Sequence, residues 1–153
     1  MIKNEKVMRL EIRKITGFEK VKAMNFVWKV FLEFEAPLFT DEGIESFRKF
    51  ITNKDIIKIL EVYGAYENEK IIGAIATRKR GNHIALFFVD GKHHRQGIGR
   101  KLFEVVLKNS TSDIITVNSS PFATGFYHKL GFVDIDKEQT ENGMRFTPMK
   151  YHK

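Results

Sequence analysis

The sequence predicts one layered domain of the α/β or α+β class. Its length of 153 residues is typical of a single domain. Short apolar runs that suit strands alternate with segments whose apolar residues recur at helical spacing. The chain has no repeat and no low-complexity tract, and its hydrophobic content of 42% lies far from the composition of disordered proteins. We therefore expect residues 1–153 to fold as one continuous domain.

The first part of the chain predicts a strand followed by two helices. Residues 8–15 alternate imperfectly between apolar and polar side chains, as a half-buried strand does. From Glu19 to Pro37 the spacing becomes helical. The apolar face of this helix consists of Val21, Met24, Val27, Trp28, Phe31 and Phe34. Thr40 or Asp41 can cap a second helix. That helix presents Ile44, Phe47 and Ile51 on one side.

Three strands and a helix are expected next. Residues 60–67 and 71–77 flank the polar pair Asn68-Glu69, which predicts an antiparallel hairpin. Residues 84–89, IALFFV, are uniformly apolar and predict a strand that is buried on both faces. An apolar stripe over residues 98–108 predicts the helix that follows.

The last part of the chain predicts another strand, a helix and two final strands. The strand covers residues 114–117, and Pro121 stands where the next helix would begin. This helix carries Phe122, Phe126, Tyr127 and Leu130. Gly131 ends it, and strands are expected around Phe132 and over residues 145–150.

Composition excludes several classes of protein. The chain contains no cysteine, so it has neither disulfides nor a thiolate nucleophile or zinc ligand. The histidines show no metal-binding spacing, and we expect no metal. No run of about 18 apolar residues and no apolar leader core are present, so we expect a cytoplasmic protein without membrane contact. The formal charge of +7 favours a polyanionic partner.

Much of that charge lies at a glycine-containing turn. Residues 92–108 hold five Lys or Arg and one Glu, which is +4 of the total. Gly97 and Gly99 stand between the apolar strand and the helix, where backbone N–H groups at a helix start form an anion site. The spacing does not match the P-loop, because Gln96 stands where its second glycine is required. It does not match the dinucleotide fingerprint either, because Leu102 replaces the third glycine.

The turn R-Q-G-I-G-R at residues 95–100 resembles the pyrophosphate loop of the GCN5-related N-acetyltransferases, the GNAT superfamily. A second segment, F-Y-H-K-L-G-F at residues 126–132, is similar to a later motif of that family. The resemblance covers roughly the whole chain. It implies the acyl-CoA N-acyltransferase fold, with a mixed, mostly antiparallel sheet of six to seven strands flanked by about four helices.

The resemblance also implies the chemistry and the site. A substrate amine attacks acetyl-CoA directly in a ternary complex, without a covalent enzyme intermediate. Backbone groups of the apolar strand hold the pantetheine arm, a backbone N–H stabilises the developing oxyanion, and the turn holds the pyrophosphate. The residues implied to bind the cofactor are Phe87, Phe88, Val89, Arg95, Gln96, Gly97, Ile98, Gly99, Arg100, Asn118, Ser120 and Tyr127. Asn118 and Ser120 are alternatives for one contact, and both could instead cap the following helix.

Catalysis is implied to use Tyr127 as the acid that protonates the departing thiolate. A phenol is protonated at neutral pH and can donate to the sulfur. A base is also expected, because the acceptor amine is cationic near pH 7. The sequence leaves six candidates, although such a side chain is more often a surface charge than a base: Glu33, Glu35, Glu61, Glu67, His83 and Asp90.

The sequence is also compatible with two other functions. A chain that binds coenzyme A without turnover would share the same motifs, and the basic triplet at residues 78–80 is compatible with a nucleic-acid-binding domain. We expect the enzyme, as a monomer or homodimer without nucleic acid, because the charge is concentrated at one turn. The motifs do not identify the acceptor, although aromatic residues in the first two helices favour an apolar or aromatic amine.

Overall fold

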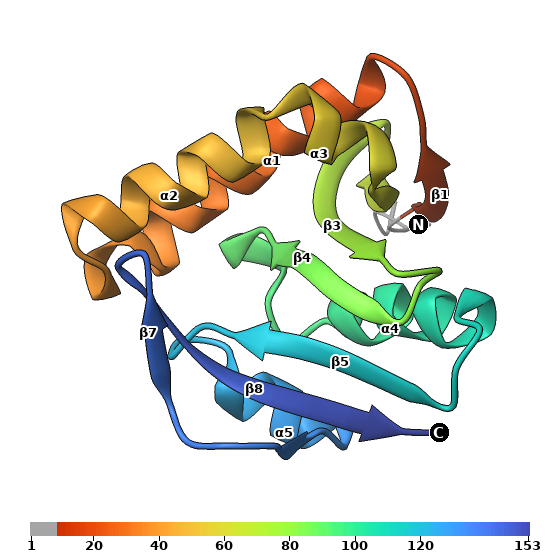
Figure 1. Cartoon of the computed structure of the whole chain (residues 1–153). Coiled ribbons are helices and arrows are strands. Elements are labelled where there is room, and N and C mark those ends of the chain that lie inside the picture. The colour runs from red at the N-terminus through yellow and green to blue at the C-terminus, as the bar shows by residue number, and fades with distance from the viewer. Residues whose placement is uncertain (1–8) are drawn as a thin grey trace, which may run out of the picture.

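The computed structural model describes residues 9–153. In this range eight strands form a sheet flanked by five α-helices and two short 3₁₀ turns (Figure 1). The strands are β1 (Leu10–Ile15), β2 (Glu61–Glu67), β3 (Lys70–Arg78), β4 (His83–Val89), β5 (Ile114–Ser119), β6 (Val133–Asp134), β7 (Gln139–Glu141) and β8 (Met144–His152). The helices are α1 (Glu19–Phe34), α2 (Asp41–Thr52), α3 (Lys54–Ile59), α4 (Ile98–Asn109) and α5 (Thr124–Leu130), with the 3₁₀ turns η1 (Ala36–Leu38) and η2 (Gly91–His93).

The sheet is mixed and mostly antiparallel, as predicted. Its order is β1-β2-β3-β4-β5-β8-β6, with β7 paired to β8, and the only parallel pair in the described chain is β4 with β5. Helices α1, α2 and α3 cover one face, whereas α4 and α5 cover the other (Figure 1). Each face packs its own apolar cluster, which gives the layered architecture expected from the sequence.

The centre of the sheet opens where β4 and β5 part. These strands pair only at His83 with Thr116 and at Ile84 with Val117. Beyond that point β4 also bulges, because Thr77 pairs with Ile84 and the next pair joins Ala76 to Leu86. The second half of β4 therefore has no strand beside it on the β5 side. The Val89 carbonyl accepts a hydrogen bond from the His94 ring at 2.8 Å, and the other backbone groups of this edge can bind a ligand.

Local sequence explains most element boundaries. Asn68 and Glu69 adopt positive φ values of 49° and 68° and close the β2–β3 hairpin, which confirms that prediction. Thr40 caps α2 by accepting a hydrogen bond from the Gly43 N–H at 3.3 Å, as expected. Asn53 ends α2 and also caps α3, a helix that the periodicity did not predict. Strand β7 was also not predicted, because its three residues are polar and exposed.

Two sequence expectations about burial need correction. Val21 was placed on the apolar face of the first helix, but it is 57% exposed. The β4 strand was expected to be buried on both faces, yet only alternate residues such as Phe88 are, whereas Phe87 and Val89 are half-buried. The reason is that Phe87 and Val89 line a cavity. Met8, the first residue of the predicted first strand, lies outside the described residues.

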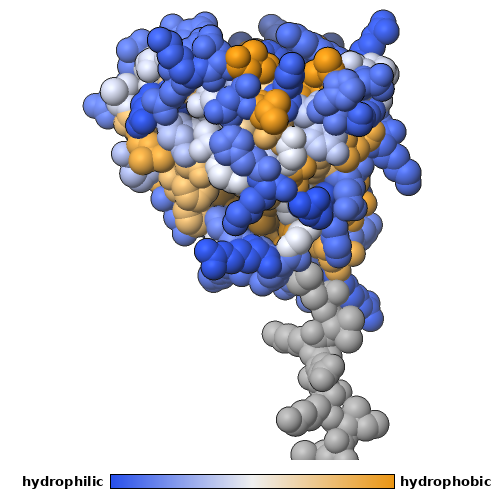
Figure 2. Space-filling view, turned by 90° about the horizontal axis from the view of Figure 1, so that it is seen from below, coloured by the Kyte–Doolittle hydropathy of each residue, from blue (hydrophilic) through white to orange (hydrophobic). Residues whose placement is uncertain are grey.

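The described surface offers no membrane-spanning element. None of the helices within residues 9–153 has the length and apolar character needed to cross a bilayer. The face in Figure 2 is mostly hydrophilic, with hydrophobic residues in small separate groups. Single exposed apolar residues are normal on a globular protein. The features that point to function lie instead in the cavities near β4.

Candidate active site

The turn between β4 and α4 has the geometry of an anion site. Arg95 adopts a φ of 65° and Gly97, at the N-cap of α4, a φ of 79°. No side chain caps this helix, and its first turn carries no acidic residue. The first N–H groups of α4 therefore have no side-chain partner, and the helix dipole makes the electrostatic potential at this end positive. A β-carbon at Gly97 would meet no atom within 4 Å, so the backbone is open to an approaching ligand.

A cavity of about 430 Å³ lies at this turn. Its walls are mainly apolar and aromatic, with ring stacking between Phe34 and Phe122 at 5.3 Å. Most of the residues that the sequence assigned to cofactor binding line it, namely Phe87, Phe88, Val89, Arg95, Gly97, Ile98, Gly99 and Arg100. Gln96 does not, because its side-chain amide donates to the Lys92 carbonyl at 3.4 Å. Phe34, Phe122 and Phe126, which complete the aromatic wall, were not among the predicted cofactor-binding residues.

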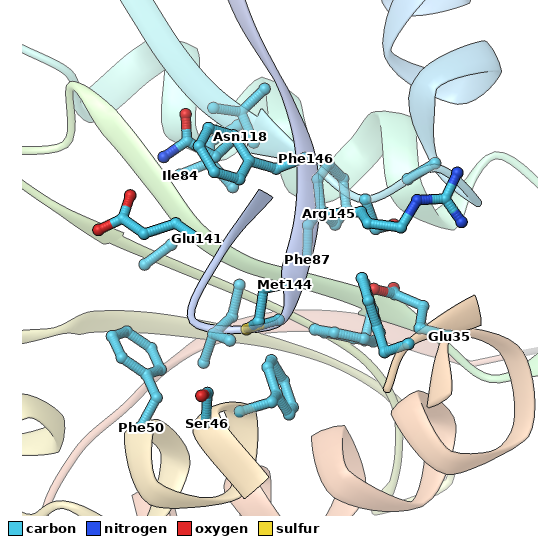
Figure 3. Close-up of a pocket in the computed structure, with 18 of the residues that line it drawn as sticks. Glu35, Ser46, Phe50, Ile84, Phe87, Asn118, Glu141, Met144, Arg145 and Phe146 are labelled. Atoms are coloured by element: carbon cyan, nitrogen blue, oxygen red, sulfur yellow. The ribbon is translucent and has the colours of Figure 1, made fainter. Parts of the chain in front are cut away.

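A second cavity, of about 370 Å³, adjoins the first. Its walls come from α2, β4, the end of β5 and the β7–β8 hairpin, as Figure 3 shows. In that view Met144 lies at the centre, with Ser46 and Phe50 of α2 below the hairpin and Glu35 and Glu141 on opposite sides. The hairpin is far from α2 in sequence, so motif analysis had no means of finding this cavity.

The β7–β8 hairpin is fastened to α2. Ser46 donates a hydrogen bond to the Asn142 carbonyl at 2.8 Å. Gly43 lies so close to the Gly143 carbonyl that any side chain at Gly43 would collide with it. Arg145 of the hairpin donates to the Leu38 carbonyl at 3.4 Å. These contacts hold the hairpin over the second cavity and give it a defined shape.

Glu35, Phe87, Phe88 and Ala123 line both cavities. They therefore mark the junction at which two ligands, one in each cavity, would meet. Of these four residues only Glu35 has an ionisable side chain. Two-substrate chemistry would take place at this junction, since reacting groups must come within about 3.5 Å of each other.

Glu35 is buried directly after α1, where its N–H donates to the Phe31 carbonyl at 2.9 Å. Burial raises the pKa of the Glu35 carboxyl to about 7, and the Ser120 hydroxyl opposes this rise. Ser120 Oγ is itself buried and makes no hydrogen bond of ordinary geometry with any described residue. The carboxyl is thus poised to change protonation state near neutral pH, which suits a general base.

Tyr127 lines the second cavity and is buried among aromatic rings. Its ring lies edge-on to Phe87 at 6.0 Å and to Phe132 at 5.2 Å. Burial raises the pKa of the Tyr127 phenol, and the charge of Glu35 raises it further. The phenol therefore stays protonated at every physiological pH and sits within electrostatic range of Glu35.

The other base candidates have different surroundings. Glu67 and Asp90 both contact the His93 ring, at 3.2 and 3.3 Å, and thereby hold the start of the turn. His83 lines the second cavity, but burial and the nearby positive charges lower its pKa to about 4. Glu33 and Glu61 line neither cavity. Within the described chain, Glu35 alone combines burial with a place at the junction.

Asn118 and Ser120 lie at the end of β5, where the sequence placed them, but they line the second cavity and not the first. The alternative, that both of them cap the following helix, is wrong. Helix α5 starts at Thr124, its N-cap residue is Ala123, and no side chain caps it. Pro121 therefore precedes the helix by a turn and does not begin it.

Comparison with known proteins identifies the family. A model of the acetyltransferase (GNAT) domain matches residues 35–153. The chain belongs to this family, and its members are acyltransferase enzymes. The superfamily resemblance that the two motifs predicted is confirmed, and so is the fold.

Solved structures show the same fold at low sequence identity. A GCN5-related N-acetyltransferase from Rhodopseudomonas palustris is 17% identical with a TM-score of 0.80, covering 97% of this chain and 99% of the other. The PaiA N-acetyltransferase from Thermoplasma acidophilum, in complex with coenzyme A, is 19% identical with a TM-score of 0.74, covering 95% and 100%. Tetrahymena GCN5 is 17% identical with a TM-score of 0.66, covering 93% and 95%.

Proposed function

We propose that this protein, acting as one domain, transfers an acetyl group from acetyl-CoA to a primary amine by direct attack in a ternary complex. The observation that carries the proposal is the pair of adjoining cavities with a buried carboxyl at their junction. The first cavity would take the cofactor and the second the amine. Each acetyl transfer would then occur beside Glu35 and Tyr127.

The residues at the first cavity fit coenzyme A. The uncapped start of α4, with Arg95 and Arg100 beside it, suits a pyrophosphate. Phe87 to Val89 pair with β3 on one side only, and their open edge toward β5 suits the amide groups of a pantetheine arm, which can add to an open strand edge. When bound, acetyl-CoA supplies an activated thioester at the junction.

The residues of the chain then supply the proton transfers. Glu35 takes a proton from the acceptor ammonium, directly or through a water molecule, and leaves a nucleophilic amine. The amine nitrogen forms a bond to the acetyl carbon, and Tyr127 donates its phenolic proton to the sulfur as the carbon–sulfur bond breaks. The second proton that the nitrogen loses then restores the phenol. Backbone N–H groups of β4 near Phe88 are suited to donate to the carbonyl oxygen on which negative charge develops.

The rival functions receive less support. A coenzyme A sensor would have no use for a second cavity with a buried carboxyl of raised pKa. A nucleic-acid-binding domain would spread its basic residues over one face. Here Arg78 lines a cavity, whereas Lys79 and Arg80 lie exposed in the turn after β3.

The proposal is tested by thiol release from acetyl-CoA across a panel of amines and peptides, with the product identified by mass spectrometry. We expect release that depends on the acceptor and an acetylated amine in equal amount. Coenzyme A binding without release for any amine would favour the sensor instead. Tight, salt-sensitive nucleic-acid binding without coenzyme A affinity would favour the third function.

A substitution at Gly97 tests the pyrophosphate site. Gly97→Ala should raise the dissociation constant of coenzyme A at least about tenfold, since the methyl group occupies the open approach to the backbone and the φ of 79° becomes strained. Gly125→Ala is the matched control, because Gly125 also has open space but lies in α5 without a positive φ. Equal affinities for the two variants, measured by calorimetry, would place the pyrophosphate elsewhere.

A further inference from the structure

The end of the second cavity away from the junction holds an arginine with one buried, unpaired hydrogen-bond donor. Arg78 is the last residue of β3, pairs in register with His83, and lines this cavity. Its Nε atom is buried and has no hydrogen-bond partner among the described residues. The guanidinium also forms no ion pair within the part of the chain that the structure describes. A buried donor without a partner is costly and implies a ligand that completes it.

The other charged groups of the cavity do not satisfy Arg78. Arg145 is already paired with Glu138, with its Nε 3.2 Å from a carboxylate oxygen. Glu141 lines the same cavity, but its residue is exposed and it forms no ion pair with Arg78. His83 is engaged with Thr116 at 2.7 Å and its lowered pKa keeps it neutral. Arg78 therefore remains the free cationic anchor in this cavity, among the residues that the structure describes.

The path from Arg78 to the junction is long and apolar. Phe88 at the junction is five residue steps along β4 from His83, which lies beside Arg78, and this corresponds to roughly 16 Å of strand. The wall between them is formed mainly by Phe39, Phe50, Leu86, Met144 and Phe146. A ligand that spans this path must be elongated and largely apolar in its middle.

We propose that the acceptor is an elongated amine with a carboxylate at the end opposite the reacting nitrogen, and that Arg78 binds this carboxylate. The proposal rests on the proposed acetyl transfer and adds the class of substrate. The planar guanidinium suits a carboxylate because it can donate two parallel hydrogen bonds. The apolar spacer would lie against the aromatic wall, and the amine would reach Glu35.

The probes are ω-aminohexanoic, ω-aminooctanoic and ω-aminododecanoic acid, with hexylamine and octylamine as acceptors that lack the carboxylate. We expect the KM of the amino acids to fall as the chain lengthens. Arg78→Gln should raise the KM of the longer acids at least about tenfold with little change in kcat, and should leave the alkylamines unaffected. The KM of Arg78→Lys for these acids should lie between those of the wild type and Arg78→Gln, because lysine keeps the positive charge but cannot donate two parallel hydrogen bonds.

Arg80→Gln is the matched control, since it removes the same charge two residues away on the exposed turn. Circular dichroism melting verifies that each variant is folded. Equal effects of Arg78→Gln and Arg80→Gln, or equal effects on acids and alkylamines, would overturn the carboxylate site. Direct calorimetry of ω-aminooctanoic acid separates the two proposals. Binding that depends on Arg78 without any thiol release contradicts the acetyl transfer alone, whereas turnover without that dependence contradicts this subsite alone.

Discussion

Glu35→Gln lowers kcat/KM for the amine by about 10² to 10³-fold, the range expected when a general base is removed. The affinity for coenzyme A stays within a factor of about two, because the glutamine side chain keeps the shape of the junction. Glu33→Gln is the matched control, since Glu33 lies two residues earlier and is exposed. Steady-state thiol release measures both variants. A loss in Glu33→Gln that equals the loss in Glu35→Gln would remove Glu35 from the role of base.

The pH dependence of the wild-type and Glu35→Gln rates tests the same role of Glu35. The base must be deprotonated to act, so wild-type kcat/KM should rise as pH passes through about 7. The ratio of wild-type to Glu35→Gln rates at each pH cancels the ionisation of the amine itself. This ratio should increase about tenfold per pH unit below 7 and level off above it. A ratio that is flat between pH 5 and pH 9 would contradict the assignment.

The free energy of unfolding should change with pH in the opposite direction to the rate, falling as pH rises. The folded protein holds a proton on Glu35 more tightly than the unfolded chain does, so this contribution to stability is fully present below pH 4.5 and is lost as pH rises through about 7. The loss relative to Glu35→Gln amounts to roughly 3 kcal/mol between these limits. Urea unfolding of the two proteins at pH 5 and pH 9 measures it. An equal stability difference at both pH values would mean that Glu35 is solvated.

The second large loss of activity is expected for Tyr127→Phe. We expect turnover to fall by about 10²-fold, because the departing thiolate loses its proton donor. Coenzyme A affinity and folding should change little, since phenylalanine keeps the ring contacts with Phe87 and Phe132. Pre-steady-state and steady-state thiol release measure the loss. Unchanged turnover would assign Tyr127 to packing alone.

The motifs near the glycine turn predicted much of the cofactor side of the site. An apolar strand, a glycine turn and an amphipathic helix follow each other within 22 residues, from Ile84 to Val105, and local sequence sets each of them. The left-handed backbone at Gly97 also follows from residue type. For these elements, the structure predicted from local sequence matches the observed fold.

The acceptor side could not be predicted in the same way. Glutamate is usually a surface residue, but the fold buries Glu35 near Ser120 and Tyr127, which are more than 80 residues away in the sequence. The cavity roof depends on contact between Gly43 of α2 and Gly143 of the hairpin. Arg78 looked like part of a basic triplet, and only the fold separates it from the exposed Lys79 and Arg80.

Binding of coenzyme A to the purified protein tests the central claim most directly. Isothermal titration calorimetry should give saturable binding of one coenzyme A per chain, weakened by salt because the pyrophosphate meets Arg95 and Arg100. The same titration with Gly97→Ala should show the weaker affinity predicted above. The absence of any coenzyme A binding to the folded wild-type protein would contradict the account.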